Sequence, residues 1–241
     1  MEKNQCHHLT LGMTAPDFTE NSTFGPLSMC DYKGKWVIFF SHPGDFTPVC
    51  TTEFIAFAEC YEEFQALGCE LLGLSIDSNP SHLAWVNDIY QLTGLTIPFP
   101  VIADRTGKVA ALYNMIAPDA SNQETVRNVY FIDPDQKIRA ILVYPLTNGR
   151  YIPEILRLLK ALQTTDRYGV VTPANWMPGQ KVLVPAAKTV TQLEQRETDP
   201  QKLGLECKDW FLCYKDIDAC NQPKPSGPMK PQLNYRNNRP R

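Results

Sequence analysis

The sequence lacks several features that mark well-defined classes of protein. No apolar run among its 241 residues is long enough to span a bilayer, and the first eight residues hold no apolar stretch of the kind found in secretion signals. The formal net charge is only −3, so no general positive field is available to attract nucleic acid. These absences predict a cytoplasmic protein without a membrane or nucleic-acid partner.

Cysteine is too sparse for a small disulfide scaffold, and no two cysteines form a Cys-x-x-Cys pair. The chain has eight cysteines, about 3% of its residues, at positions Cys6, Cys30, Cys50, Cys60, Cys69, Cys207, Cys213 and Cys220. In a reducing cytosol, thiols in this number are typical of redox chemistry, metal binding or buried core positions rather than of permanent bridges. The surroundings of each cysteine decide which of these applies.

The feature that organises the chain is a junction between a strand and a helix. Five β-branched or aromatic residues at 36–40 predict a buried strand, and a short loop leads from it into a helical pattern. Thr47 is a suitable N-cap, and Pro48 suits the first helical position. Cys50 then lies in the first turn, near unpaired backbone N–H groups that favour the thiolate. This placement predicts a nucleophile, and the alternative is an inert buried cysteine.

Apolar patterns in the rest of the chain predict an α/β fold. The helix after Cys50 extends to about Gly68. The other expected elements are a short hairpin within residues 9–35, strands at 70–77, 99–103, 126–133 and 137–144, and helices from residue 79, at 109–113 and at 152–162. A parallel βαβ half followed by an antiparallel ββα half is the thioredoxin arrangement.

The character of the sequence changes after residue 163, where prolines increase and periodic apolar residues become few. We expect a thioredoxin-like domain at 1–165, an extension at 166–221 with a short helix near 192–197, and a disordered tail at 222–241. The tail holds five prolines and five Lys or Arg residues but no acid. A solvated tail is the simplest interpretation, and binding of an anionic surface is the alternative.

The segment from His42 to Glu53 resembles the active-site motif of peroxiredoxins, Pro-x-x-x-Thr-x-x-Cys, with Pro43, Thr47 and Cys50 at its fixed positions. The residues of this segment are similar to those of the one-cysteine subfamily, and of its archaeal-type members in particular. The resemblance runs from about residue 11 to 214. It implies a thioredoxin-like fold whose C-terminal extension packs across a homodimer, with rings of dimers such as decamers.

The resemblance also implies a function. Peroxiredoxins reduce hydrogen peroxide and organic hydroperoxides to water and alcohols without a metal or organic cofactor, and a thioredoxin-like protein supplies the electrons. Attack by the Cys50 thiolate on a peroxide oxygen would give a sulfenic acid, and the departing oxygen requires preorganised donors and a fixed cation. Arg127 stands where the family has that cation, whereas its sequence surroundings alone would indicate a solvated surface charge.

Other residues match family positions around this centre. Glu53 and Arg150 stand where the family has a network that orients the active-site arginine. The Thr47 hydroxyl would bond the sulfur or the peroxide, and Pro43 would form an apolar wall that limits access of water. His42 is a candidate for a polar contact with substrate, or a structural histidine at the end of a strand. Asp45 and Phe46 would shape either the pocket or an interface.

A sulfenic acid is oxidised further unless a thiol resolves it. The spacing of Cys207 and Cys213 is similar to that in the archaeal-type relatives, in which the second cysteine resolves the first-domain cysteine of another subunit. The resemblance therefore implies Cys213 as the resolving cysteine and Cys207 as its exchange partner. A zinc site made from Cys207, Cys213 and Cys220, with Cys6, His7 and His8, is an alternative that lacks the usual closely spaced pair.

Three other functions compete with the peroxidase hypothesis. A thioredoxin-type disulfide reductase needs a Cys-x-x-Cys at the helix start, and position 47 is Thr. The phospholipase activity of some subfamily members needs a Gly-x-Ser-x-Gly before the core strand, and residues 31–36 contain no serine. A peroxide sensor or an oxidation-triggered holdase would share Cys50 chemistry, and sustained turnover with a thioredoxin-like reductant distinguishes it from an enzyme.

Overall fold

The computed structural model describes residues 8–121 and 124–217. The chain divides after Arg150 into two compact units, and each is described by itself. The expected tail at 222–241, like Cys6, His7 and Cys220, lies outside the described residues.

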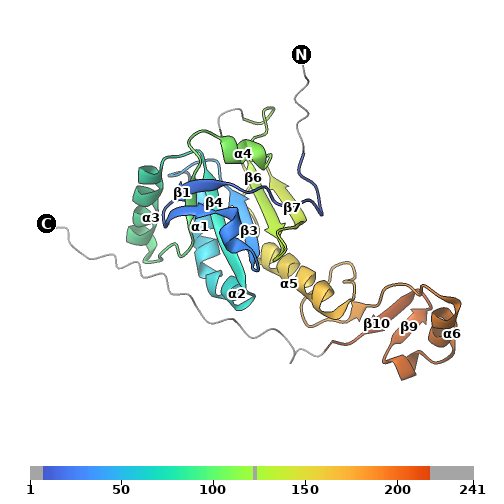
Figure 1. Ribbon diagram of the computed structural model, residues 1–241. Coiled ribbons are helices and arrows are strands. Elements are labelled where there is room, and N and C mark those ends of the chain that lie inside the picture. The colour runs from blue at the N-terminus through green and yellow to red at the C-terminus, as the bar shows by residue number, and fades with distance from the viewer. Residues whose placement is uncertain (1–7, 122–123, 218–241) are drawn as a thin grey trace, which may run out of the picture. The chain divides into compact units, whose positions relative to one another are not determined.

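A mixed seven-stranded sheet forms the centre of the first unit (Figure 1). Its strands lie in the order β2 (Gly25–Ser28), β1 (Thr19–Ser22), β5 (Val101–Ala103), β4 (Cys69–Ser75), β3 (Trp36–Ser41), β6 (Arg127–Ile132) and β7 (Ile138–Tyr144). Strands β3, β4 and β5 are parallel neighbours, whereas β6 pairs with β3 and β7 in antiparallel fashion. The thioredoxin-like arrangement, with the β1–β2 hairpin before it, is confirmed.

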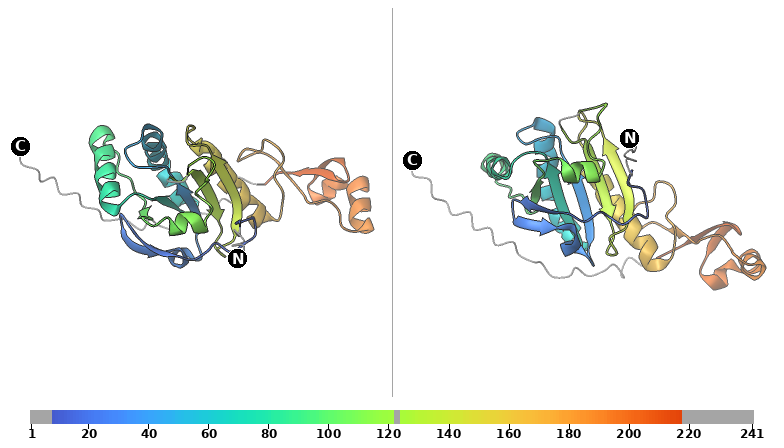
Figure 2. Two further views of the ribbon diagram at one scale, coloured as in Figure 1. Left: turned by 90° about the horizontal axis from the view of Figure 1, so that it is seen from above. Right: turned by 45° about the horizontal axis from the view of Figure 1, so that its top comes forward.

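The side chains of β3 alternate between the two faces of this sheet, as strand geometry requires. Val37 and Phe39 belong to a buried cluster that includes Val109 of α4 (Lys108–Leu112). Phe40 points to the other face, where its ring stacks on Phe57 of α1 (Pro48–Glu59) with centroids 4.4 Å apart. Figure 2 shows the same division, with α1 and α3 (Asn79–Thr93) on one face and α4 on the opposite face.

Helix α1 is shorter than the sequence predicted. It ends at Glu59, and a separate helix α2 (Tyr61–Ala66) follows a turn at Cys60, whose ψ angle is 2°. On the two sides of this turn Phe57 and Phe64 are both fully buried, with ring centroids 6.1 Å apart. The apolar spacing therefore predicted correctly which side chains are buried, but it did not predict that the helix is interrupted at Cys60.

An aromatic cluster fixes α1 against the sheet. Phe54 lies 5.6 Å from Phe40 and 4.6 Å from Trp85 of α3, measured between ring centroids. A Cβ atom at Gly73 of β4 would lie only 3.3 Å from the Phe54 ring and 3.4 Å from the Phe40 ring. Glycine at this position therefore gives the two rings room, and the packing holds the N-terminal turn of α1 in place.

The second unit begins with α5 (Ile152–Tyr168) and continues with α6 (Val190–Thr198) and a short 3-10 helix at Pro200–Leu203. An antiparallel sheet has the order β8 (Val182–Leu183), β10 (Leu212–Lys215) and β9 (Glu206–Asp209). The sequence had predicted only irregular pieces with one short helix after residue 163. The strands were missed because they are two to four residues long and their apolar positions are few.

A small core of its own supports this unit. Ala161, Val170, Trp176 and Val182 form a buried cluster, and Trp176 is 2% exposed. Helix α5 extends to Tyr168, so the boundary expected at residue 165 falls inside a helix. The compact units divide before that helix instead, and the three-part organisation of the whole chain remains a prediction.

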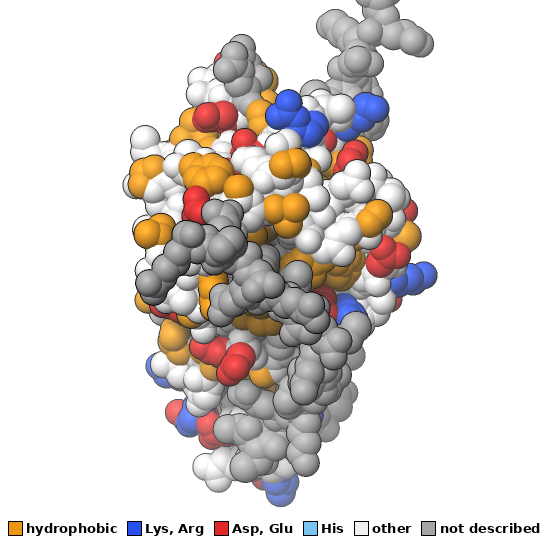
Figure 3. Space-filling view, turned by 90° about the vertical axis from the view of Figure 1, so that its left-hand side faces the viewer, with side chains coloured by type: hydrophobic (Ala, Val, Ile, Leu, Met, Phe, Trp, Pro, Cys, Tyr) orange, Lys and Arg blue, Asp and Glu red, His pale blue; other side chains and the backbone are white. Residues whose placement is uncertain are grey.

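The visible surface on the side of α3 carries mixed side chains. Hydrophobic groups are interspersed with acidic and basic ones, and among the described residues no single sign of charge covers this face (Figure 3). Leu83, Tyr90 and Leu92 of α3 contribute exposed apolar surface, with Leu92 79% exposed. Within residues 8–121 and 124–217, no helix is long and apolar enough to cross a membrane.

Candidate active site

Cys50 lies in the first turn of α1 and is fully buried. Thr47 occupies the N-cap position with extended backbone angles of −101° and 144°, and Pro48 follows as the first helical residue. The Thr51 N–H donates to the Thr47 carbonyl at 3.0 Å, which is the usual i to i−4 bond. The N–H groups of Val49 and Cys50 precede it in the helix, so they have no intrahelical acceptor. They supply partial positive charge at the start of the helix that carries the sulfur.

The Thr47 side chain does not cap the helix, which corrects the sequence-based expectation. Its hydroxyl instead donates to the Gly44 carbonyl at 2.8 Å. The loop between β3 and α1 is closed by this bond, and its Phe46 adopts a left-handed φ of 56° with the side chain exposed. Pro43 is buried in the same loop. The first-turn N–H groups therefore stay available for another acceptor.

Arg127 is the first residue of β6 and is 2% exposed, so it is not a surface charge. Its Nη1 donates to the Cys50 Sγ at 3.3 Å and to Glu53 Oε2 at 2.8 Å. Its Nε and Nη2 both donate to the Leu146 carbonyl, at 3.0 and 2.8 Å. A guanidinium held at both ends in this way presents one nitrogen to the sulfur in a fixed position.

Glu53 lies one helical turn beyond Cys50 and joins two arginines. Its Oε1 accepts from the Arg150 N–H and Nε at 2.8 and 2.9 Å, and its Oε2 accepts from Arg150 Nη2 at 2.6 Å. Arg150 Nη1 donates to the carbonyls of Ser41 and Asn128. Burial lowers the pKa of Arg150, and the Glu53 carboxylate opposes that effect.

The charged side chains around the Cys50 sulfur do not balance one another. Arg127 and Arg150 carry two positive charges and Glu53 carries one negative charge, and all three side chains are at most 3% exposed. The three side chains together carry one unit of positive charge in a buried region. The two guanidinium groups therefore leave net positive charge beside the Cys50 sulfur.

His42 lies in a second buried network. Its Nε2 is 3.1 Å from Asp45 Oδ1, and His82 Nδ1 of α3 is 2.8 Å from Asp45 Oδ2. Burial lowers the pKa of His42. Burial alone would raise the pKa of Asp45, but hydrogen bonds from His42 and His82 hold it well below its ordinary value. The His42 ring also stacks on Trp85 with centroids 5.2 Å apart, so the residue has a structural role, and its contact with substrate stays a prediction.

Sequence reasoning missed His82 and left the role of Asp45 open. The available signal was the position of His82 on the apolar face of the expected helix, three residues before Trp85. Ligand atoms of His42, Asp45 and His82 lie within 4.8 Å of one another, a spacing that a metal ion could use. Hydrogen bonds with the two histidines already occupy both Asp45 oxygens.

The C-terminal cysteines lie in the second unit. Cys207 and Cys213 form a disulfide, which excludes a zinc site that uses both of their sulfurs in this state. Cys30, Cys50 and Cys69 are free thiols: Cys69 is buried, and burial raises its pKa strongly, whereas Cys30 is exposed. Neither of these two has a cation in hydrogen-bond contact comparable to Arg127 at Cys50 within the described part of the chain.

A thioredoxin-like fold with a buried cysteine at a helix start and an arginine on its sulfur defines a class of thiol enzymes. Residues 11–141 match the AhpC/TSA family, and residues 161–199 match the C-terminal domain of 1-Cys peroxiredoxin. The chain is 55% identical to peroxiredoxin 2 of Caldanaerobacter subterraneus over 207 residues, which cover 86% of this chain and 93% of that protein. A peroxiredoxin of Thermoplasma volcanium is 52% identical, with 86% and 98% covered.

Solved structures agree with these sequence relationships. Peroxiredoxin 6 of Arenicola marina has a TM-score of 0.78 at 34% identity, with 88% of this chain and 99% of that chain covered. A yeast mitochondrial 1-Cys peroxiredoxin has a TM-score of 0.76 at 37% identity, with 87% and 100% covered. The chain belongs to the peroxiredoxin family, and the family and fold expected from the sequence are confirmed.

Proposed function

We propose that this chain is a thiol peroxidase, a thioredoxin-dependent peroxide reductase, that reduces hydrogen peroxide and organic hydroperoxides through Cys50. The Cys50 thiolate attacks one peroxide oxygen, the O–O bond breaks, and the other oxygen leaves as hydroxide or alkoxide and takes up a proton. The products are Cys50 sulfenic acid and water or an alcohol. The single observation that carries the proposal is the contact of Arg127 Nη1 with both the Cys50 sulfur and Glu53.

The surroundings of the sulfur suit this step because negative charge moves from sulfur to the leaving oxygen. Arg127 and the first-turn N–H groups are fixed donors at the place where that charge develops, so little reorganisation is needed. Glu53 and Arg150 keep Arg127 in position. The Thr47 hydroxyl hydrogen is used by Gly44, so its oxygen is free to accept a hydrogen bond from the peroxide.

Pro43 and His42 complete the proposed pocket. Pro43 is buried in the loop that leads to Cys50, and in this proposal it limits the access of water to the sulfenic acid. His42 is held by Asp45, and its Nδ1 has no hydrogen-bond partner among the described residues. This nitrogen is therefore available for a polar contact with the substrate.

Resolution of the sulfenic acid requires a second thiol. Cys213 of a partner subunit attacks the Cys50 sulfenic sulfur, water leaves, and an interchain disulfide forms. A thioredoxin-like protein then supplies two electrons. The yeast mitochondrial neighbour is described as resolved via glutathione/thioredoxin systems, which supports an external thiol donor of this kind. The active form in this proposal is a homodimer, assembled into a ring of dimers such as a decamer, in the cytoplasm.

The decisive experiment measures peroxide reduction by fully reduced protein, first in single turnover and then in the steady state with a thioredoxin system. Cys50→Ser should abolish both signals, because within residues 8–121 and 124–217 no other sulfur has the Arg127 contact. Cys30→Ser, at an exposed free cysteine, should leave both unchanged. Undiminished consumption by Cys50→Ser, or a reduced Cys50 beside other oxidised thiols, would contradict the proposal. A fast single turnover without sustained turnover would indicate a peroxide sensor.

A further inference from the structure

Arg150 is a buried cation with two aromatic rings beside it. Its side chain has no exposed surface. Its Cζ lies over the Phe40 ring, 5.0 Å from the centroid, and over the Phe57 ring at 5.7 Å. The electron-rich face of an aromatic ring attracts a cation at such distances, and the attraction is strongest where water is excluded. Phe40 and Phe57 therefore stabilise the charge of Arg150 in addition to packing in the core.

The other cations that lie over rings are closer to solvent. Arg139 lies over Trp36 with its side chain 27% exposed. Arg167 and Lys208 lie over tyrosine rings, and both residues are exposed. Within residues 8–121 and 124–217, only Arg150 combines a fully buried side chain with contacts to two rings.

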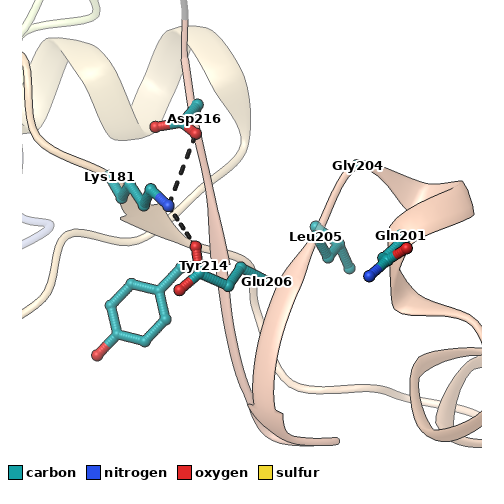
Figure 4. Close-up of a pocket in the computed structure, with 7 residues that line it drawn as sticks. All are labelled: Lys181, Gln201, Gly204, Leu205, Glu206, Tyr214 and Asp216. Atoms are coloured by element: carbon teal, nitrogen blue, oxygen red, sulfur yellow. Dashed lines mark hydrogen bonds and ion pairs between the residues drawn. The ribbon is translucent and has the colours of Figure 1, made fainter.

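A cation of the second unit shows how exposure replaces such rings. Lys181 lines a hollow together with Glu206 and Asp216 (Figure 4). It forms an ion pair with Glu206, and its Nζ lies 3.8 Å from Asp216 Oδ2. The Lys181 side chain is 44% exposed, so water completes its solvation. At the buried Arg150, the two rings take the place that water has at Lys181.

Hydrogen bonds hold the edge of the Arg150 guanidinium but do not balance the charge of the site. Nε and Nη2 donate to the Glu53 carboxylate, and Nη1 donates to the carbonyls of Ser41 and Asn128 at 2.9 and 3.2 Å. These donors all point outward in the guanidinium plane. Glu53 neutralises only one of the two arginines that it joins. The negative potential of the ring faces offsets part of the remaining positive charge.

Helix α1 connects one of these rings to the reacting group. Cys50, Glu53 and Phe57 stand at positions i, i+3 and i+7, so they lie on one side of the helix. The Phe57 ring stacks on Phe40 of β3 with an interplanar angle of 18°. The surface against which Arg150 rests is therefore built from the helix that carries the sulfur and from the strand that precedes it.

We propose that Phe40 and Phe57 are positioning residues for peroxide reduction, an inference that rests on the proposed function. The two rings hold the Arg150 guanidinium, and Arg150 in turn holds both oxygens of the Glu53 carboxylate. Glu53 Oε2 also accepts from Arg127 Nη1 at 2.8 Å, the nitrogen that donates to the reacting sulfur. A weaker hold on Arg150 is passed along this chain and misplaces the donor that the leaving oxygen needs.

The test weakens the negative potential of a ring face while keeping the shape of the ring. Phe40→4-fluorophenylalanine and Phe40→3,4,5-trifluorophenylalanine are made in the full-length protein by site-specific incorporation. Stopped flow then measures the rate of Cys50 oxidation by one equivalent of hydrogen peroxide in the reduced protein. The rate should fall with each added fluorine, by about fivefold for three. The same series at Phe57 should cause a smaller decrease, because that ring lies farther from Arg150.

The matched control is Phe99, which belongs to the same aromatic cluster. It is 1% exposed, and its ring centroid lies 5.8 Å from Phe40 and 5.5 Å from Phe54. In the described part of the chain no lysine or arginine lies over its ring. Fluorination of Phe99 should therefore leave the oxidation rate unchanged, although it alters ring-to-ring contacts. Urea unfolding of all variants shows whether any change in rate follows a change in packing.

The outcomes separate this inference from the proposed function. Equal rates throughout the Phe40 series, or an equal decrease in the Phe99 series, would overturn the positioning role and leave the peroxidase intact, since wild type still oxidises Cys50. A wild type in which peroxide does not oxidise Cys50 would overturn the proposed function, and with it any reaction for the rings to assist. A decrease confined to the Phe40 and Phe57 series supports the positioning role.

Discussion

The region around Cys50 and the strand pair of Cys207 and Cys213 both place charged side chains near sulfur, but in different solvent environments. The Glu53 carboxylate and the two arginines that bind it are at most 3% exposed. Lys181 and Glu206, which tie the strand pair together, have side chains that are 44% and 65% exposed. Buried charges must keep their partners, whereas exposed ones are screened and exchange with water. The geometry of the first region therefore depends on its ion pairs, whereas the fold of the second region depends little on its own.

The largest expected effect tests this difference directly. Glu53→Gln removes the carboxylate charge between two buried guanidinium groups and should lower the free energy of unfolding by about 3–5 kcal/mol. The matched variant Glu206→Gln, at an exposed ion pair, should have no measurable effect on stability. Urea unfolding of the reduced proteins measures both. Equal losses in the two variants would mean that burial does not distinguish the two regions.

A somewhat smaller effect is expected on the rate. Arg127→Lys keeps the positive charge but cannot hold Leu146, Glu53 and Cys50 together with one ammonium group, so the donor at the sulfur is lost. The second-order rate of Cys50 oxidation should fall by about 10²–10³-fold. Stopped-flow measurement with one equivalent of peroxide determines this rate. Arg139→Lys, on the neighbouring strand β7 and paired with Asp133, serves as the control and should retain the wild-type rate.

The smallest expected effect concerns pH. The pKa of buried His42 is lower in the folded protein than its ordinary value of 6.5, so below about pH 6.5 the unfolded chain binds more protons and stability falls. Asp45, whose pKa is also lowered, adds to this loss as the pH falls below about 4. Urea unfolding between pH 7 and 3 measures the dependence.

The Asp45 contribution can be isolated by substitution. Asp45→Asn should be less stable than wild type at pH 7. The difference should shrink as the pH falls below about 4, because the Asp45 carboxylate of the unfolded wild-type chain then binds a proton while that of the folded protein stays ionised, which lowers wild-type stability. Glu206→Gln should follow the wild-type profile, since that side chain is exposed. A constant difference between Asp45→Asn and wild type at every pH would show that the carboxylate charge of Asp45 does not stabilise the fold.

Local patterns predicted most of the elements of the first unit. Three of these patterns depend only on residues that are close in the sequence, and all three appear in the structure. They are the apolar run at 36–40, the N-cap position of Thr47 and the Pro-Asp turn between β6 and β7. Prediction was poorer in the second unit, because strands of two to four residues leave almost no periodic signal. The turn at Cys60 was also invisible, since no glycine or proline marks it.

For the site, the sequence by itself determined that Cys50 stands in the first turn of a helix, since strand, loop, Pro48 and helix follow one another directly. Only the tertiary structure decided what surrounds the sulfur. Arg127 is 77 residues away and reaches Cys50 because β6 pairs with β3, and Asp45 joins His42 to His82 because α3 packs beside α1. Such contacts depend on the order of strands and on side-chain packing, for which hydrophobic periodicity carries no information.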